Sequence, residues 1–196
     1  MIDDHVRSEM IFYATTGDYS DAERYEKFAL ACNLDKKAFE IGRVVRGLVG
    51  TLKVRRPVEI LETASATGLT AVGVAKELTK SGIKHIYTSL DIEQNLLDYA
   101  KACGRGDKFV QGDFENLPFA DESFNIYIMM GAEGCRPKGK FYAEVYRVLK
   151  SGGHYVMPQI GPRPIVSDLE KDNALKSGLT IVRADNYLIC KSLDQI

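Results

Sequence analysis

Three segments of the chain place small residues or carboxylates at the end of an apolar stretch. They lie about 23 residues apart, at Gly68, Asp91 and Phe114. Small residues after a strand, as in 64–68, let a ligand lie against the backbone, and the helix that follows offers free amide donors. A carboxylate that ends a strand, such as Asp91, can accept hydrogen bonds from both hydroxyls of a ribose. The series therefore predicts a nucleotide-type cofactor site built from the carboxyl ends of three successive strands.

Each segment also has a purely structural interpretation. Residues 64–68 alone could form a tight turn packed against a neighbour, and Asp91 could cap the helix that follows it. Asp113 could meet an adenine edge, with Ile92 and Phe114 offering apolar surface to the ring, or it could belong to a surface turn. The order and spacing of the three segments favour the site.

The elements that must position these residues alternate between strands and helices. An amphipathic helix carries Ile41, Val45 and Val49 on one face, and strands and helices follow it in turn. Strands are predicted at 58–62, 85–91, 108–111, 124–130, 154–159, 179–183 and 187–191. Helices are predicted at 21–32, 69–80, 94–103, 140–150 and 165–176. Such alternation predicts a parallel α/β sheet with helices on both faces, and the final hairpin implies an antiparallel last strand.

Composition excludes several classes of protein. The 196 residues carry a formal net charge of −1, so the sequence lacks the basic footprint of nucleic-acid binding. No apolar stretch is long enough to span a bilayer, and the first residues do not resemble a signal peptide. The four cysteines show no metal-ligand spacing, so we expect no metal and reduced thiols in a cytoplasmic protein.

The chain is expected to divide into an N-terminal lid segment, residues 1–35, and a main domain, residues 36–196. The first segment is polar and shows little periodicity outside its short helix. It contains Tyr13, Tyr19 and Tyr25, which could contact a substrate or pack onto the domain. The sequence leaves a homodimer open.

Four motifs carry a resemblance to a known family. Residues 62–68 resemble the first motif of class I S-adenosylmethionine-dependent methyltransferases, and 89–92 resemble the second, whose acid holds the ribose. Residues 109–119 with 121–125 are similar to the third motif, and 144–153 resemble the helix and glycine turn before the fifth strand. The resemblance covers about residues 57–160. It implies a Rossmann-like, doubly wound sheet of seven strands, mostly parallel, with an antiparallel last strand.

The resemblance also implies an activity and a site. It implies S-adenosylmethionine-dependent methyl transfer to a small-molecule acceptor, with no metal. Carried onto this chain, the expected cofactor-binding residues are Glu62, Ala64, Ser65, Ala66, Gly68, Asp91, Ile92, Asp113, Phe114 and Met130. Glu133 follows the fourth strand and is the candidate general base, or else a solvated acid on a loop.

The chain departs from the family pattern at three positions. Ala64 and Ala66 stand where the family usually has glycine, and a positive φ at Ala66 would cost about 1 kcal/mol or more. Asn125 stands where Asp is frequent, which we expect to be a minor surface change. The two alanines motivate an alternative, a non-catalytic interaction module with the same fold. A nicotinamide-dependent oxidoreductase is disfavoured because, of the three glycines of its fingerprint, only Gly68 is present.

Overall fold

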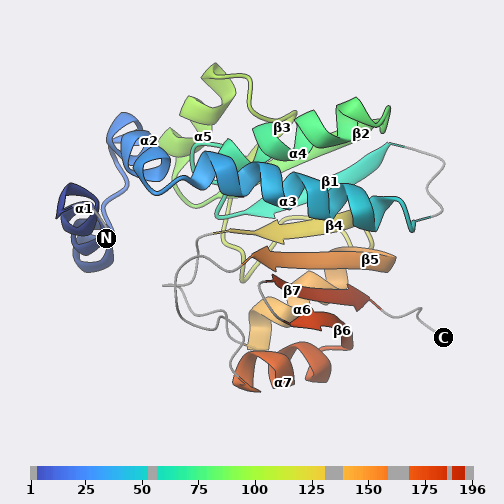
Figure 1. Cartoon of the computed structure of the whole chain (residues 1–196). Helices are drawn as coiled ribbons and strands as arrows, with labels where there is room; N and C mark the ends of the chain where they lie inside the picture. Colours follow the sequence, from blue (N-terminus) through green and yellow to red (C-terminus); the bar gives the residue numbers. More distant parts are fainter. Residues whose placement is uncertain (1–3, 53–56, 131–138, 159–167, 185–186, 193–196) are drawn as a thin grey trace.

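The computed structural model describes residues 4–52, 57–130, 139–158, 168–184 and 187–192. Seven strands form one sheet in the order β3-β2-β1-β4-β5-β7-β6 (Figure 1). The strands are β1 (Val58–Thr63), β2 (His85–Asp91), β3 (Lys108–Gln111), β4 (Phe124–Met129), β5 (Leu149–Pro158), β6 (Leu179–Ala184) and β7 (Tyr187–Ser192). Strands β1 to β5 pair in parallel, whereas β7 pairs antiparallel with both β5 and β6. The predicted α/β, Rossmann-like class is confirmed.

Seven helices in the described part of the chain connect or flank these strands (Figure 1). They are α1 (Asp4–Thr16), α2 (Ala22–Ala31), α3 (Leu34–Val49), α4 (Leu69–Lys80), α5 (Gln94–Ala102), α6 (Gly139–Val148) and α7 (Asp168–Lys176). None of them is both long and apolar enough to cross a membrane, a statement that holds for the residues described.

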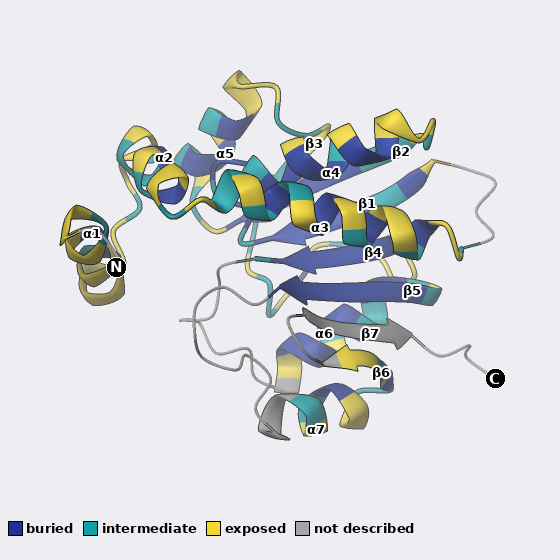
Figure 2. Cartoon of the chain, in the orientation of Figure 1, coloured by how far each residue is buried: buried dark blue, intermediate teal, exposed yellow. Residues whose placement is uncertain are grey.

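The central strands β1, β2, β4 and β5 are largely buried, as parallel strands between helices must be (Figure 2). On one face α3 and α4 pack Ile41, Val45 and Val74 against the strands. On the other face α6 contributes Phe141 and Val145 to a second cluster. The apolar stripe predicted along 41–52 therefore faces the core.

Helices α3 and α4 cross at unusually short range because two glycines meet there. A Cβ added to Gly42 would lie 2.5 Å from the carbonyl oxygen of Gly73. A Cβ added to Gly73 would lie 2.3 Å from the backbone of Ala38. Both glycines have ordinary helical backbones, so they are needed for close approach and not for their conformational freedom. This crossing holds α4 against α3.

The N-terminal segment contains a helix that the sequence pattern did not predict. Helix α1 lies at the periphery of the molecule and is anchored mainly to α2 (Figure 1). Arg24 of α2 makes a bidentate ion pair with Glu9, with Nε donating to Oε2 at 2.8 Å and Nη2 to Oε1 at 2.9 Å. Tyr13 of α1 is buried. Because few apolar side chains hold α1, it shows no periodic stripe, and this explains the failure of the prediction.

Two other expectations are corrected. Strand β5 begins at Leu149, before the glycine turn that was expected to precede it, because Leu149 pairs with Phe124 of β4. Asn125 is not a surface residue. Its side chain is 8% exposed, and its Oδ1 accepts the amide of Glu59 at 3.0 Å. The amide-bearing side chain thus ties β4 to β1 inside the sheet.

Candidate functional site

The carboxyl ends of β1, β2 and β3 meet at one edge of the sheet, since the three strands are adjacent and parallel. A cavity of ≈ 400 Å³ lies at this edge. Its walls include seven of the ten residues expected to bind a cofactor: Ala64, Ala66, Asp91, Ile92, Asp113, Phe114 and Met130. The spacing argument is thereby supported, because residues far apart in the chain surround one space.

The turn after β1 adopts the left-handed backbone that glycine favours. Ala64 has φ +51°, Ala66 has φ +47° and Gly68 has φ +76°. The positive φ expected at Ala66 is therefore present, at Ala64 as well. L-residues pay about 1–2 kcal/mol for this conformation. The turn keeps the shape a glycine-rich loop would take, and it does so under strain.

Asp91 ties the turn after β1 to the end of β2. Its Oδ2 accepts the amide of Ala66 at 2.8 Å, and its Oδ1 accepts the amide of Glu93 at 3.0 Å. The second bond supports the start of α5, as the capping interpretation predicts, and Asp91 also lines the cavity. Burial raises the pKa of Asp91 above its usual value. A carboxylate oxygen can accept more than one hydrogen bond, so both oxygens retain acceptor capacity toward the cavity.

Glu62 belongs to a smaller compartment of ≈ 20 Å³ beneath the turn. Its side chain is fully buried, the Tyr87 hydroxyl donates to its Oε2 at 3.0 Å, and burial raises its pKa to about 8. Ser65 lines the same compartment, and its buried Oγ has no partner among the described residues. The compartment therefore offers a carboxyl group and an unused hydroxyl to a polar ligand.

The opposite wall of the large cavity is mixed in character. Asp113 is exposed, and its Oδ1 accepts the amide of Glu115 at 2.8 Å, so it also forms the surface turn that was considered. Ile92 is 64% exposed at the rim. Phe114 contacts Phe141 of α6 edge-on, with ring centroids 5.6 Å apart. An aromatic ligand would find apolar surface here and a carboxylate near its edge.

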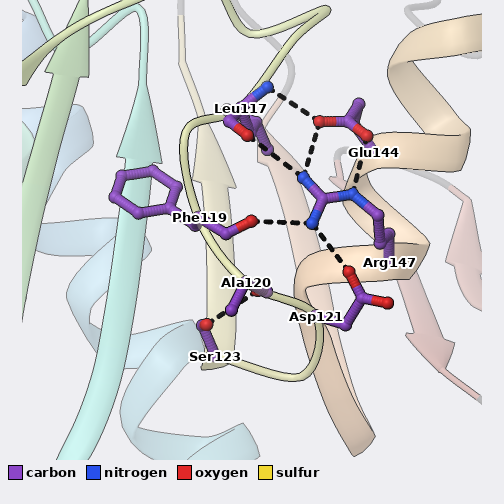
Figure 3. Close-up of polar contacts among 7 residues, drawn as sticks. All are labelled: Leu117, Phe119, Ala120, Asp121, Ser123, Glu144 and Arg147. Atoms are coloured by element: carbon purple, nitrogen blue, oxygen red, sulfur yellow. Dashed lines mark hydrogen bonds and ion pairs between the residues drawn. The ribbon is translucent and has the colours of Figure 1, made fainter.

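The loop that carries Phe114 is fixed by Arg147 of α6 (Figure 3). The guanidinium donates to the carbonyls of Leu117 and Phe119 at 3.1 and 2.7 Å, and it pairs with Asp121 and Glu144. Glu144 in turn accepts the amide of Leu117 at 2.7 Å. In the sequence, Glu144 and Arg147 stand out only as members of the 144–153 motif. Their i, i+3 spacing on a helix was the available signal.

Two contacts dock the N-terminal segment at the cavity, and sequence reasoning missed both. Asn95 of α5 donates from Nδ2 to the carbonyls of Tyr19 and Ser20, at 2.7 and 2.9 Å. Arg105 pairs with buried Glu26 at 2.9 Å and donates to the carbonyl of Thr67 at 3.0 Å. These contacts join residues far apart in sequence, and no local sequence pattern predicts them.

Among the expected site residues that the structure describes, Gly68 lines neither compartment. Gly68 faces away from the ligand space, since a Cβ there would lie 2.9 Å from Cβ of Arg105. Its smallness serves the packing of the turn against the end of α5. Glu133 lies outside the described residues. Among the residues described, no group of three His, Cys, Asp or Glu side chains is placed to hold a metal ion.

Part of the chain is similar in sequence to known proteins. Residues 64–157 match the family described as a methyltransferase domain. A phthiotriol/phenolphthiotriol dimycocerosates methyltransferase of Mycobacterium tuberculosis is 37% identical over 119 residues, which are 59% of this chain and 43% of that protein. The chain thus spans less than half the length of this relative.

Solved structures share the fold at low sequence identity. The CurJ carbon methyltransferase has a TM-score of 0.66 and 14% identity, covering 80% of this chain and 54% of that one. A putative S-adenosyl-L-methionine-dependent methyltransferase from Methanococcus maripaludis has a TM-score of 0.63 and 16% identity, covering 91% and 95%. Residues 64–157 are thus similar to a methyltransferase domain, and the fold is one that S-adenosylmethionine-dependent methyltransferases share.

Proposed function

We propose that this chain binds S-adenosylmethionine in the cavity at the strand ends and transfers its methyl group to a small-molecule acceptor. One observation carries the proposal. The turn after β1, the carboxylate ending β2 and the Asp113-Phe114 pair after β3 surround a single cavity of ≈ 400 Å³. A cavity of this size suits a small organic ligand or cofactor.

The residues present fit the proposed cofactor. Asp91 keeps acceptor capacity for the ribose hydroxyls, and Phe114 and Ile92 give apolar surface to the adenine ring. Glu62 and the unpartnered Ser65 hydroxyl lie in the smaller compartment, where the charged amino-acid end would be held. The cofactor supplies the reactive methyl group, and the chain supplies position and a dry site.

The alternative is a non-catalytic interaction module, and its motivation is the alanine-substituted turn. The structure does not favour it. Ala64 and Ala66 both take the left-handed backbone, and the cavity beside them stays open. If the turn no longer bound a ligand, Ala64 and Ala66 would be expected to adopt an unstrained backbone conformation.

The acceptor is proposed to be a lipid-like or polyketide-like small molecule. The support is the printed name of the mycobacterial relative, a dimycocerosates methyltransferase, and the apolar rim formed by Ile92. Should the acceptor need to lose a proton, Glu133 is the base that we propose from its place after β4. Nucleic acid is not proposed as an acceptor, because the net charge is −1. A cytoplasmic location and a homodimer stay predictions.

The N-terminal segment, residues 1–35, is proposed to act as a lid. Its Tyr19 and Tyr25 line the cavity, and Asn95 holds the connection between α1 and α2 at the cavity mouth. A segment docked by a few polar contacts over a ligand cavity is suited to opening and closing.

Calorimetric titration with S-adenosylmethionine tests the cofactor, and incubation with methyl-labelled cofactor and a panel of lipid and polyketide acceptors tests transfer. We expect saturable one-to-one binding and label transfer to at least one acceptor class. Absence of binding would contradict the proposed function and favour the interaction module. Binding without transfer to any acceptor in the panel would contradict the acceptor class alone.

A further inference from the structure

Tyr25 occupies an unusual place in the site, because it belongs to both compartments. Only four described residues line both the large cavity and the small one: Tyr25, Ala64, Ala66 and Met130. Three of them come from the sheet edge, whereas Tyr25 comes from α2 in the N-terminal segment. It is the only aromatic side chain of the four.

The covalent structure of S-adenosylmethionine determines which of its atoms would lie where the two compartments meet. Its nucleoside would occupy the large cavity beside Asp91, and its amino-acid end would reach the small compartment that Glu62 lines. The sulfur joins these two parts, so it would fall where the compartments meet. In S-adenosylmethionine this sulfur is a sulfonium cation, whereas in the demethylated product it is a neutral thioether.

The position of Tyr25 is fixed by contacts on both sides. Its neighbour Glu26 is buried and pairs with Arg105, which also donates to the carbonyl of Thr67 in the cofactor turn. The ring of Tyr25 contacts those of Tyr13 and Tyr19 at centroid distances of 5.5 and 5.6 Å. These contacts hold the side chain in place while the N-terminal segment is docked on the domain.

The hydroxyl of Tyr25 stays protonated in this setting. Burial, and then the nearby charges of Tyr19 and Asp91, raise its pKa well above the usual value, and Glu62 contributes in the same direction. Tyr25 is thus a neutral, electron-rich ring. An aromatic ring of this kind attracts a cation that lies near its face, most strongly where water is excluded.

We propose that Tyr25 is a specificity-determining residue, whose ring makes the site prefer the sulfonium cofactor over the neutral demethylated product. This inference rests on the proposed function. It assigns to the N-terminal segment a part in distinguishing cofactor from product, beyond covering the site. Release of the product would be assisted, because the ring loses its attraction once the methyl group has left.

Calorimetry on the full chain tests the inference through the ratio of the dissociation constants of S-adenosylmethionine and S-adenosylhomocysteine. Three variants are compared with the wild type: Tyr25→Leu, Tyr25→Phe and, as a matched control, Tyr13→Leu. Tyr13 belongs to the same aromatic cluster but lines neither compartment. Circular dichroism establishes that each variant is folded.

We expect Tyr25→Leu to weaken S-adenosylmethionine binding about three- to tenfold more than product binding, the size of a partly desolvated cation–π contact. Tyr25→Phe should keep the wild-type ratio, and Tyr13→Leu should leave the ratio unchanged even if it weakens both ligands. Equal losses for both ligands in Tyr25→Leu would overturn the inference, as would a Tyr25→Phe variant that behaves like Tyr25→Leu. A wild type that binds both ligands equally would overturn it while leaving the proposed function intact, whereas binding of neither ligand would remove the proposed function itself.

Discussion

The amide of Ala66 donates to Oδ2 of Asp91 at 2.8 Å, so the carboxylate that ends β2 holds the strained turn that follows β1. The same carboxylate supports the start of α5 through the amide of Glu93. A single side chain thus aligns two of the three strand ends that form the cavity. Its removal should affect both the ligand and the turn.

We expect Asp91→Ala to weaken S-adenosylmethionine binding by about 1–3 kcal/mol, because charge-assisted hydrogen bonds to the ribose would be lost. Titration calorimetry measures the change. Asp98→Ala is the control, since Asp98 is an exposed acid on the neighbouring helix α5 that accepts a hydrogen bond from Gln94 and lines neither compartment. Unchanged affinity in Asp91→Ala would rule out its role at the ribose.

Ala66→Gly should tighten cofactor binding, because the turn could approach the ligand without a Cβ. From the sequence alone, Ala66→Gly is also predicted to lower stability slightly, because glycine increases the conformational freedom of the unfolded chain. The observed φ of +47° reverses that sign. Relief of about 1–2 kcal/mol of strain exceeds an entropic cost of about 0.4–1 kcal/mol.

Urea unfolding of Ala66→Gly tests this reversal, with Ala143→Gly as the control. Ala143 is exposed within helix α6, where glycine should cost about 1 kcal/mol. The two identical substitutions should therefore change stability in opposite directions. A loss of stability in both variants would show that the turn is not strained.

Gly73→Ala should destabilise the fold by more than about 2 kcal/mol, since the new methyl group would meet the backbone of Ala38 and force α3 and α4 apart. Gly47→Ala on α3 is the matched control. A Cβ at Gly47 meets nothing within 4 Å, so the alanine should stabilise the helix by about 0.5–1 kcal/mol. Denaturant unfolding measures the change in the unfolding free energy of each variant. Equal changes in Gly73→Ala and Gly47→Ala would contradict a tight crossing of α3 and α4.

Arg147→Lys should lower stability by about 1–3 kcal/mol and weaken cofactor binding, although the charge is kept. A lysine cannot reproduce the planar fork that reaches the carbonyls of Leu117 and Phe119 (Figure 3). Asp121→Ala serves as the control, because the Asp121 side chain is 74% exposed and such a surface pair contributes about 0–1 kcal/mol. If the lysine variant matched the wild type in both measurements, the loop would not depend on the fork.

Glu62 should make stability depend on pH. Burial raises its pKa from 4.5 in the unfolded chain to about 8 in the fold, so the folded state holds the proton more tightly. Its favourable contribution is therefore complete below pH 4.5 and is lost as the pH rises to about 8. The difference in unfolding free energy between wild type and Glu62→Gln should fall across this range and then level off. A difference that stays constant with pH would mean that Glu62 is ionised in the fold.

The sequence predicted the parts of the fold that rest on local periodicity. The apolar stretches of β1, β2 and β4 and the stripe of α3 follow directly from residue patterns, and the strand-end site followed from their order. Helix α1 was not predicted, because an ion pair and one buried tyrosine hold it and neither forms a repeating pattern along the helix.

The contacts that support the site could not be predicted from the sequence for a different reason. Asn95 and Arg105 bond to carbonyl groups of segments about 38 to 76 residues away, so their partners exist only in the folded chain. Asn125 was misjudged because an amide at the start of a strand looks like a surface residue, whereas β1 supplies it with a buried donor. Conversely, the positive φ at Ala66 was predictable, since glycine is common there in the family that the motifs resemble.

The large cavity takes its walls from the N-terminal segment and from the ends of three strands. A ligand that fills it would link the N-terminal segment, which is docked through Asn95 and Arg105, to the strand ends of the sheet. Occupancy and foldedness are then thermodynamically linked, and a ligand at one hundred times its dissociation constant would add about 2.7 kcal/mol to the stability of the chain. The fraction of the chain that is folded would therefore rise with the supply of the ligand.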